Sequence, residues 1–398
     1  MPLRVVIAPD KFRGSLTAIE AAQAMAEGAR RAHPDAVIDC CPLADGGEGT
    51  VAALVSATGG SYHVCRVTGP LPEQKVDATF GMLGDGRTAV IEMAAASGLA
   101  LLKAEERNPM FTTTFGTGQL LVEAVRLGAQ RIILGIGGSA TIDAGIGCAQ
   151  ACGLPVLLDG GEPVSATEPL TGADLPRVVL IKHGRGSPID RVAITVACDV
   201  TNPLFGSDGA AGVYGPQKGA SPQQIAQLDE WLRHLAQRTG KLAEAMTPGA
   251  GAAGGLGFAM LAFFGATLRS GAELAIDMTD LRRRLQGADL CLTGEGRLDA
   301  SSAHGKAPIA VARLCREMGV PCTVIAGSAG AKAELEKIEG LSNYVVLNDG
   351  SAPIEATIRD AAKLVAEAAE KLTRSVSTTI KTSDREADIA PPRPAPLR

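Results

Sequence analysis

The stretch 288–308, ADLCLTGEGRLDASSAHGKAP, combines glycine with charged side chains directly after a short apolar run. The apolar run predicts a buried strand, and the glycine-rich segment that follows predicts a loop. In parallel α/β sheets, ligands bind where a strand ends and the chain turns toward a helix. Glycine amides can approach phosphate, basic side chains neutralise it and carboxylates hold a divalent cation. The candidates are Gly294, Gly296, Arg297, His304 and Lys306 for phosphate, and Glu295 and Asp299 for metal.

Other glycine-bearing loops repeat this combination. The first apolar run, 3–8, leads into a loop with Asp10, Lys11 and Arg13, and either Ser15 or Thr17 can cap the helix that follows. Further loops carry Asp45 and Glu48 beside Gly46 and Gly47, Gly137, Gly138 and Ser139 beside Asp143, and Asp199 beside Asn202. Each has a plainer explanation as a helix cap, a turn or an ordinary charged surface loop.

One segment matches a different enzyme class. Gly135, Gly137 and Ala140 match the relaxed dinucleotide fingerprint, and Asp159 follows at the distance of a ribose-binding acid. An NAD-dependent dehydrogenase of a small hydroxy acid is therefore an alternative. Asp143 disfavours it, because like charges about 4 Å apart at a dielectric of about 20 repel by roughly 4 kcal/mol. Several carboxylates among glycines suit a nucleoside triphosphate with Mg²⁺ better.

Other motifs are missing from the sequence. Gly305 and Lys306 precede Ala307 rather than Ser or Thr, so there is no P-loop, and no G-x-S-x-G elbow occurs. The net charge of −5 disfavours nucleic acid, and no run approaches a membrane span of about 20 apolar residues. Nine cysteines without framework spacing predict free thiols in a reducing cytoplasm. No CxxC pair occurs, so the cysteines do not indicate a zinc site.

The apolar periodicity predicts alternating strands and helices at both chain ends, with shorter strands between them. Expected strands are 3–8, 37–41, 62–68, 76–81, 88–92, 131–136, 192–198, 289–293, 322–326 and 344–347. The main expected helices end near residue 32 and span 221–237, 307–318 and 354–372. Beyond residue 373 the chain is polar and rich in proline, which predicts a disordered tail, 374–398.

Taken together, these motifs closely resemble the class I glycerate kinases of bacteria. The segments that carry the resemblance, in order between residues 3 and 372, are APDKFRGSLTA, PLADGGEGT, GPL, IEMAAASGL, NPMFTTTFGTGQL, GIGGSATIDAG, ACDVTNPLFG, FGSDGAAGVYGPQKGA, PGAGAAGGLG, LTGEGRLD and HGKAP. The family usually reads GGSATNDGG, where this chain has Ile142 in place of Asn and Ala144 in place of Gly.

The resemblance implies a two-domain α/β fold. A Rossmann-like three-layer domain would come from both chain ends, 1–65 and 285–373, with an inserted α/β domain, 66–284, and the active site in the cleft between them. It also implies an enzyme that phosphorylates D-glycerate with ATP, at the 2-hydroxyl to give 2-phosphoglycerate. The cysteine pattern adds the expectation of a cytoplasmic location. The alternative product of the same reaction is 3-phosphoglycerate. Mg²⁺ is the expected cofactor, and a homodimer is allowed, with neither nucleic acid nor membrane as partner.

Residue roles follow as hypotheses from this resemblance. Asp199, Asp45 or Asp10 would accept the hydroxyl proton. The expected substrate-binding residues are Lys11, Arg13, Ser15, Asn202 and Arg297. Nucleotide contacts would come from Lys306, His304, Ser139 and the glycines Gly46, Gly47, Gly137, Gly138, Gly294 and Gly296, with Glu295 and Asp299 on the metal. A sugar-acid sensor on the same scaffold is the non-enzyme alternative, and it predicts binding without ATP consumption.

Overall fold

The computed structural model describes residues 2–44, 46–161, 164–165, 167–182, 186–299, 302 and 306–387. The chain divides into two compact units, each described by itself. Unit 1 comprises residues 1–42, 280–304 and 308–398, and unit 2 comprises 43–279 and 305–307. No helix among the described residues has both the length and the apolarity needed to cross a membrane.

Unit 1 is built on a five-stranded sheet in the order β13-β12-β11-β1-β2. All four neighbouring pairs are parallel. The strands are β1 (Arg4–Ile7), β2 (Val37–Cys40), β11 (Leu290–Leu298), β12 (Cys322–Ala329) and β13 (Tyr344–Val346). Strands from both ends of the sequence therefore share one sheet.

Helices cover both faces of this sheet. Ile325 of β12 points into the same apolar cluster as α1 (Ala18–Ala32) and α15 (Ala361–Ala387), whereas its neighbours Val324 and Ala326 join the cluster of α12 (Ala307–Met318). This alternation is the period of two that a strand buried on both faces requires. The remaining helices are α11 (Leu281–Arg284), α13 (Lys332–Leu335) and α14 (Ile354–Arg359).

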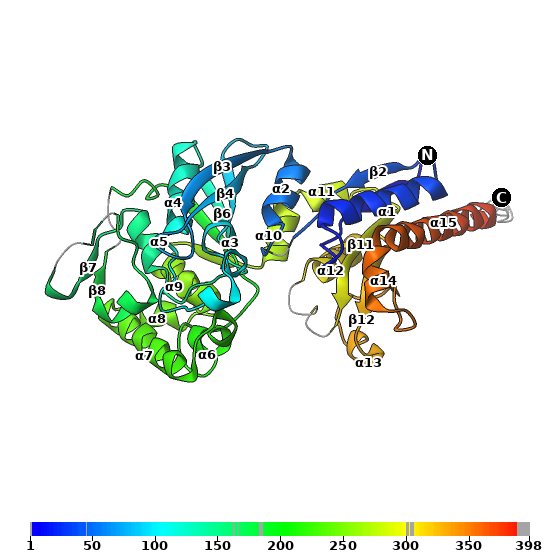
Figure 1. Ribbon diagram of the computed structural model, residues 1–398. Helices are drawn as coiled ribbons and strands as arrows, with labels where there is room; N and C mark the ends of the chain where they lie inside the picture. Colours follow the sequence, from blue (N-terminus) through cyan, green and yellow to red (C-terminus); the bar gives the residue numbers. More distant parts are fainter. Residues whose placement is uncertain are drawn as a thin grey trace, which may run out of the picture. The chain divides into compact units, whose positions relative to one another are not determined.

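Helices α1 and α15 lie side by side (Figure 1). Thr17 and Glu20 form a capping box at the start of α1, so Thr17 rather than Ser15 is the cap. A Cβ on Gly28 would lie 2.0 Å from the carbonyl oxygen of Ala366, so this close approach requires glycine. Small residues thus allow α1 and α15 to pack closely together.

The closing helix is longer than predicted. One helix was expected to end near residue 372, but α14 ends at Arg359 and α15 continues to Ala387. Residues 374–387 contain neither glycine nor proline, the two residues that most strongly interrupt a helix. Residues 388–398, with the prolines of the expected tail, lie outside the described residues.

Unit 2 contains a six-stranded sheet in the order β10-β9-β6-β5-β4-β3. β5, β6, β9 and β10 are parallel, while β3 and β4 complete the sheet as antiparallel strands. The bounds are β3 (Ser61–Thr68), β4 (Lys75–Met82), β5 (Thr88–Glu92), β6 (Arg131–Gly135), β9 (Ala193–Ala197) and β10 (Thr267–Arg269). A separate antiparallel pair consists of β7 (Val156–Leu158) and β8 (Val178–Ile181).

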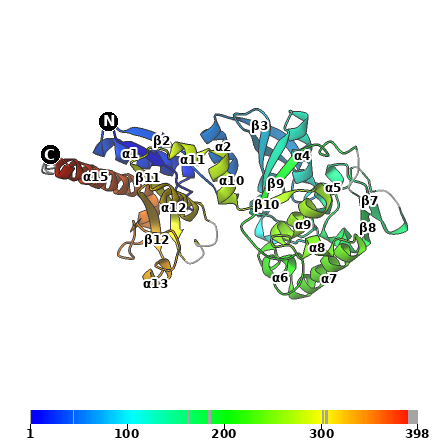
Figure 2. The same cartoon turned by 180° about the vertical axis from the view of Figure 1, so that it is seen from behind.

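Most of the helices of unit 2 pack into one large apolar core. The helices that contribute residues to this core are α3 (Ala94–Ser97), α4 (Phe115–Arg126), α5 (Ile146–Ala151), α6 (Ala210–Tyr214), α7 (Pro222–Arg238), α8 (Leu242–Ala245) and α9 (Ala252–Phe264). The unit also contains α2 (Thr50–Thr58) and α10 (Gly271–Met278). Helix α9 lies against β9 and β10, which Figure 2 shows from behind. The fold is thus α/β in both units, as the sequence predicts.

The first boundary between the units lies between residues 42 and 43, whereas it was expected near residue 65. The difference concerns α2, which packs on the sheet of unit 2. A Cβ on Gly81 of β4 would lie 2.3 Å from Cγ2 of Val55, and Glu92 of β5 accepts hydrogen bonds from the backbone N–H groups of Gly49 and Val51. These contacts form only between distant parts of the sequence.

Candidate functional site

The strand order of unit 1 creates a switch point between β1 and β11. From β1 the sheet continues to β2 on one side, and β11, β12 and β13 continue it on the other. Chain connections therefore leave these two parallel strands in opposite directions. Ligands of open α/β sheets bind outside the carboxyl ends of the strands at such a point.

The loop after β1 crosses this point and is fixed by backbone hydrogen bonds. The N–H of Ala8 donates to the carbonyl of Leu292 at 2.8 Å, and that of Asp10 donates to the carbonyl of Gly294 at 2.9 Å. Asp10 is only 4% exposed, and its Oδ1 accepts from the N–H of Lys11 at 2.7 Å. The side chain of Lys11 is half-buried. A buried carboxylate and a lysine therefore occupy the switch point.

Two further predicted residues lie in this loop. Arg13 is exposed, and its backbone lies against Gly296. Ser15 donates from Oγ to the carbonyl of Phe12 at 3.0 Å, so its hydroxyl braces the loop.

The prediction of a loop at residues 294–299 is wrong, because β11 continues through Leu298. Its glycines pack against backbone. A Cβ on Gly294 would lie 2.3 Å from the carbonyl oxygen of Ile325, and one on Gly296 would lie 2.8 Å from the nitrogen of Arg13. Close packing of chain segments thus explains glycine at both positions, and a phosphate contact from them stays a prediction.

The charged residues of β11 differ in their surroundings. Glu295 is 5% exposed, whereas the side chain of Arg297 is 65% exposed. Arg297 Nε lies 3.1 Å from Oδ2 of Asp299, and the N–H of Asp299 donates to Oγ of Ser302. The structure therefore brings Glu295 and Asp10 to one strand edge and gives Asp299 an arginine partner.

A second set of predicted residues gathers at the carboxyl ends of β6 and β9 in unit 2. Gly46 and Gly47 pass directly over these ends. A Cβ on Gly46 would lie 2.5 Å from the Cβ of Ala197, one on Gly135 would lie 2.4 Å from the carbonyl oxygen of Gly46, and one on Gly137 would lie 3.2 Å from Cα of Gly47. The two glycine loops are therefore stacked on one another, which requires small residues in both.

A buried lysine that the sequence analysis missed supports the second of these loops. Lys218 is 1% exposed, and its Nζ donates to Oγ of Ser139 and to the carbonyl of Thr141, both at 2.7 Å. Gly138 adopts φ +73, which favours glycine. Lys218 lies 77 and 79 residues from its partners, so spacing gave no signal of this contact.

Burial lowers the pKa of Lys218 to about 7, and the negative charge of Asp143 opposes that shift. In the unfolded chain the lysine keeps its proton up to about 10.5. Between these values the unfolded state binds more protons than the folded state, so this residue makes the free energy of unfolding rise with pH.

Lys218→Met is expected to remove that rise. Wild type and variant are unfolded in urea at several pH values between about 7 and 10.5. As pH increases, the free energy of unfolding of the wild type should rise relative to that of the variant. Lys182→Met, at an exposed lysine of the same unit, is the control. If the free energy of unfolding changed with pH in the same way in the wild type and in Lys218→Met, the lowered pKa of Lys218 would be contradicted.

Asp143 has a structural role in this unit. Its Oδ2 accepts from both the N–H and the Oγ of Thr114, at 2.8 and 2.7 Å, and its Oδ1 accepts from the N–H of Gly145. The residue is fully buried, and burial raises the pKa of its carboxyl group, while these hydrogen bonds oppose the shift. Asp143 was expected to repel a bare pyrophosphate over this loop, but its carboxylate is turned to the protein and anchors the threonine-rich loop before α4.

Asp199 and Asn202 follow β9 and hold neighbouring segments. Asp199 is exposed, and its Oδ1 accepts from the N–H of Gly271 at the start of α10, at 3.0 Å. The amide of Asn202 donates to the carbonyl of Asp208 and accepts from the hydroxyl of Tyr214. Both residues are thus oriented by the protein itself.

Three other predicted residues lie at or near the start of unit 2 and before α12. Asp45 and His304 lie outside the described residues. Lys306 is half-buried and directly precedes α12.

The structure contradicts the dinucleotide alternative. The fingerprint requires a helix directly after the glycines and then a neighbouring parallel strand. Here α5 begins only at Ile146, and β7, which precedes Asp159, belongs to the separate antiparallel pair. The glycines were correctly expected after a strand, but the helix and strand that complete a dinucleotide site are absent from this part of the described chain.

A parallel sheet with a buried carboxylate and basic groups at its switch point, and glycine loops on a second sheet, is an arrangement typical of α/β enzymes. The glycerate kinase family model matches residues 5–377, so the chain belongs to the glycerate kinase family and is an enzyme, a kinase. This confirms the resemblance seen in the sequence.

Three comparisons illustrate the similarity. Glycerate kinase of Bacillus subtilis is 44% identical over 382 residues, covering 95% of this chain and 98% of the relative. Glycerate 2-kinase of Escherichia coli is 46% identical over 333 residues, covering 82% and 85%. The crystal structure of a glycerate kinase 2 candidate from Salmonella typhimurium LT2 has a TM-score of 0.84 at 40% identity, covering 97% of this chain and all of that one.

Proposed function

We propose that this kinase transfers the γ-phosphoryl group of ATP to the 2-hydroxyl of D-glycerate, giving 2-phosphoglycerate and ADP. The family supports the phosphoryl donor and the acceptor acid, and the relative from Escherichia coli bears the name of a 2-kinase. The observation that carries the proposal is the position of Asp10 and Lys11 at the switch point of unit 1, where the N–H of Asp10 donates to the carbonyl of Gly294, the residue before the buried Glu295.

Phosphoryl transfer requires positioning and charge neutralisation more than covalent chemistry by the protein. Lys11 and Arg13, on the braced loop after β1, supply positive charge for the carboxylate of glycerate or for phosphate oxygens. Lys306, before α12, adds charge at a helix start, where anions are favoured. Arg297 is held by Asp299, so we assign it a weaker part in binding the substrate.

The donor set at the switch point fits Mg²⁺, which prefers carboxylate oxygen. Glu295 and Asp10 are the carboxylates with least exposure at this edge, so we assign the metal to them and give Asp299 a supporting role through Arg297. Bound there, Mg²⁺ would neutralise charge on the phosphates of ATP.

In unit 2 we propose Asp199 as the base that accepts the proton of the 2-hydroxyl. The N–H of Gly271 fixes one of its carboxylate oxygens, which orients the side chain. Lys218 is a positioning residue, since it holds Ser139 and the backbone at Thr141 for contact with a bound anion.

An assay of ADP release tests this function. The purified chain, given ATP and Mg²⁺, should release ADP only when D-glycerate is added, and L-glycerate should substitute poorly. Lactate, which has a 2-hydroxyl but no 3-hydroxyl, tests whether the enzyme also recognises the 3-hydroxyl of glycerate. ADP release at the same rate without any hydroxy acid would reject the proposal.

A further inference from the structure

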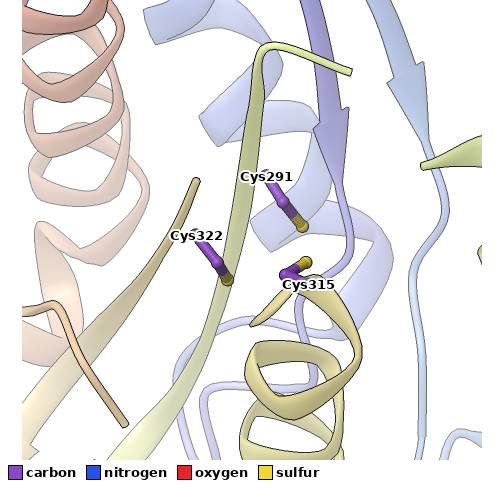
Figure 3. A group of neighbouring side chains, drawn as sticks. All are labelled: Cys291, Cys315 and Cys322. Atoms are coloured by element: carbon purple, nitrogen blue, oxygen red, sulfur yellow. The ribbon is translucent and has the colours of Figure 1, made fainter. Parts of the chain in front are cut away.

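Three cysteines from three different elements meet in the interior of unit 1. Cys291 lies on β11, Cys315 on α12 and Cys322 at the start of β12 (Figure 3). Cys291 and Cys322 are direct partners in the parallel pairing of β11 with β12, and Cys315 reaches toward them from the helix that covers this face. All three Sγ atoms lie within 4.8 Å of one another.

This spacing is close to that of a metal–thiolate site. With metal–sulfur bonds of about 2.3 Å, three sulfurs in a trigonal plane around one ion are about 4.0 Å apart. Each sulfur would therefore have to move by less than about 1 Å, which a change in side-chain rotation can supply. We propose that Cys291, Cys315 and Cys322 form a three-thiolate binding site for Cu(I).

The ligand set favours Cu(I) over harder metal ions and over metal ions that take four or more ligands. Thiolates select soft cations, and structural zinc almost always takes four ligands. Within the described part of the chain, the group contains only these three metal-binding side chains. A site with three sulfurs and no fourth donor suits an ion that accepts three ligands.

Binding of the ion requires the three thiols to become thiolates, because the thiolate is the form of cysteine that holds a metal. The three protons are released to solvent when the ion binds. Because binding exchanges protons for the cation and transfers no electrons, it needs no oxidant or reductant.

A surface pocket gives the ion a way in. Cys291 and Cys315 are fully buried, but Cys322 is partly exposed. It lines a pocket of about 340 Å³ together with Arg316 and Gly319 near the end of α12 and Ser342 and Asn343 before β13. An incoming ion would therefore meet Cys322 before it reached the buried pair.

The site went unnoticed in the sequence for a physical reason. Zinc and copper motifs are recognised from short spacings such as CxxC, whereas 24 and 7 residues separate these three cysteines (291 to 315, and 315 to 322). Only the sheet pairing and the covering helix bring them together.

Anaerobic titration of the reduced, full-length protein with Cu(I), against a chromogenic chelator of known affinity, tests the proposal. One Cu(I) per chain should be taken from the chelator, with a sulfur-to-copper absorption band. Cys315→Ser should weaken binding at least about 100-fold, because loss of outer partners alone costs 10–100-fold. Cys65→Ser, a cysteine of unit 2, should bind as wild type does.

A second readout uses the wild type alone, in case Cys315→Ser does not fold. Bound Cu(I) should protect Cys322 from alkylation, as measured by mass spectrometry of the peptides, and leave the exposed Cys40 reactive. Equal alkylation of Cys322 with and without Cu(I), equal affinity in Cys315→Ser, or retention of Zn²⁺ against excess Cu(I) would each overturn the proposal. The outcome does not depend on the kinase reaction.

Discussion

Asp199→Asn is expected to lower kcat for D-glycerate by about 10²–10⁴-fold, the usual contribution of a general base. Asparagine keeps an oxygen that can accept the N–H of Gly271, so the start of α10 should stay in place. It cannot accept the proton of the substrate. Steady-state kinetics should therefore show a fall in kcat with little change in KM, and thermal unfolding should match that of the wild type.

Two comparisons separate catalysis from capping at this position. Asp199→Ala also removes the cap and should lose about 1 kcal/mol of stability in addition. Asp77→Asn, at an exposed aspartate that pairs with Arg66, is the matched control and should leave kcat unchanged. If Asp199→Asn turns over normally while Asp199→Ala is merely less stable, the residue is only a cap and the base lies elsewhere.

Glu295→Gln is expected to lower kcat/KM at fixed Mg²⁺ by at least about 100-fold, since it removes a proposed ligand of the metal. The change preserves size and removes charge from a residue that is 5% exposed, so the fold should persist. Kinetics over a range of Mg²⁺ concentrations should show that the variant needs more metal and recovers part of its activity when metal is abundant.

The control for this variant is Glu336→Gln, an exposed glutamate of unit 1 beside Lys332. It should show the Mg²⁺ dependence of the wild type. An unchanged Mg²⁺ dependence in Glu295→Gln, together with reduced stability, would assign Glu295 a role in packing and contradict its place on the metal.

Local sequence predicted the elements of the parallel sheets well. Runs such as 131–136 and 88–92 became β6 and β5 because fully buried strands are continuously apolar. The prediction failed at Gly294 and Gly296. Glycine usually indicates a loop, but here it permits close packing within and beside β11, which depends on segments distant in sequence.

The candidate site residues differ in how far their structural settings could be read from the sequence. Asp10 was correctly expected in the loop after the first strand, whereas Glu295, expected in a loop, lies within β11. Asp143 bonds to Thr114, which lies 29 residues away, and no local pattern shows that contact. Lys218 was missed for the same reason.

The two departures from the family pattern have different structural settings. Ile142 is fully buried in the core of unit 2, so the apolar side chain is accommodated where the family has asparagine. Ala144, in place of the usual glycine, adopts φ +49, a left-handed conformation that favours glycine. The backbone of this loop thus keeps a glycine-like shape without the glycine.

Transfer of the γ-phosphoryl group from ATP to the 2-hydroxyl of D-glycerate is tested most directly by phosphorus NMR of the product. When the purified enzyme has consumed ATP with D-glycerate and Mg²⁺, the new phosphorus signal should couple to the single proton on carbon 2. Coupling to the two protons on carbon 3 would identify 3-phosphoglycerate and contradict the account, as would ATP that is left unchanged.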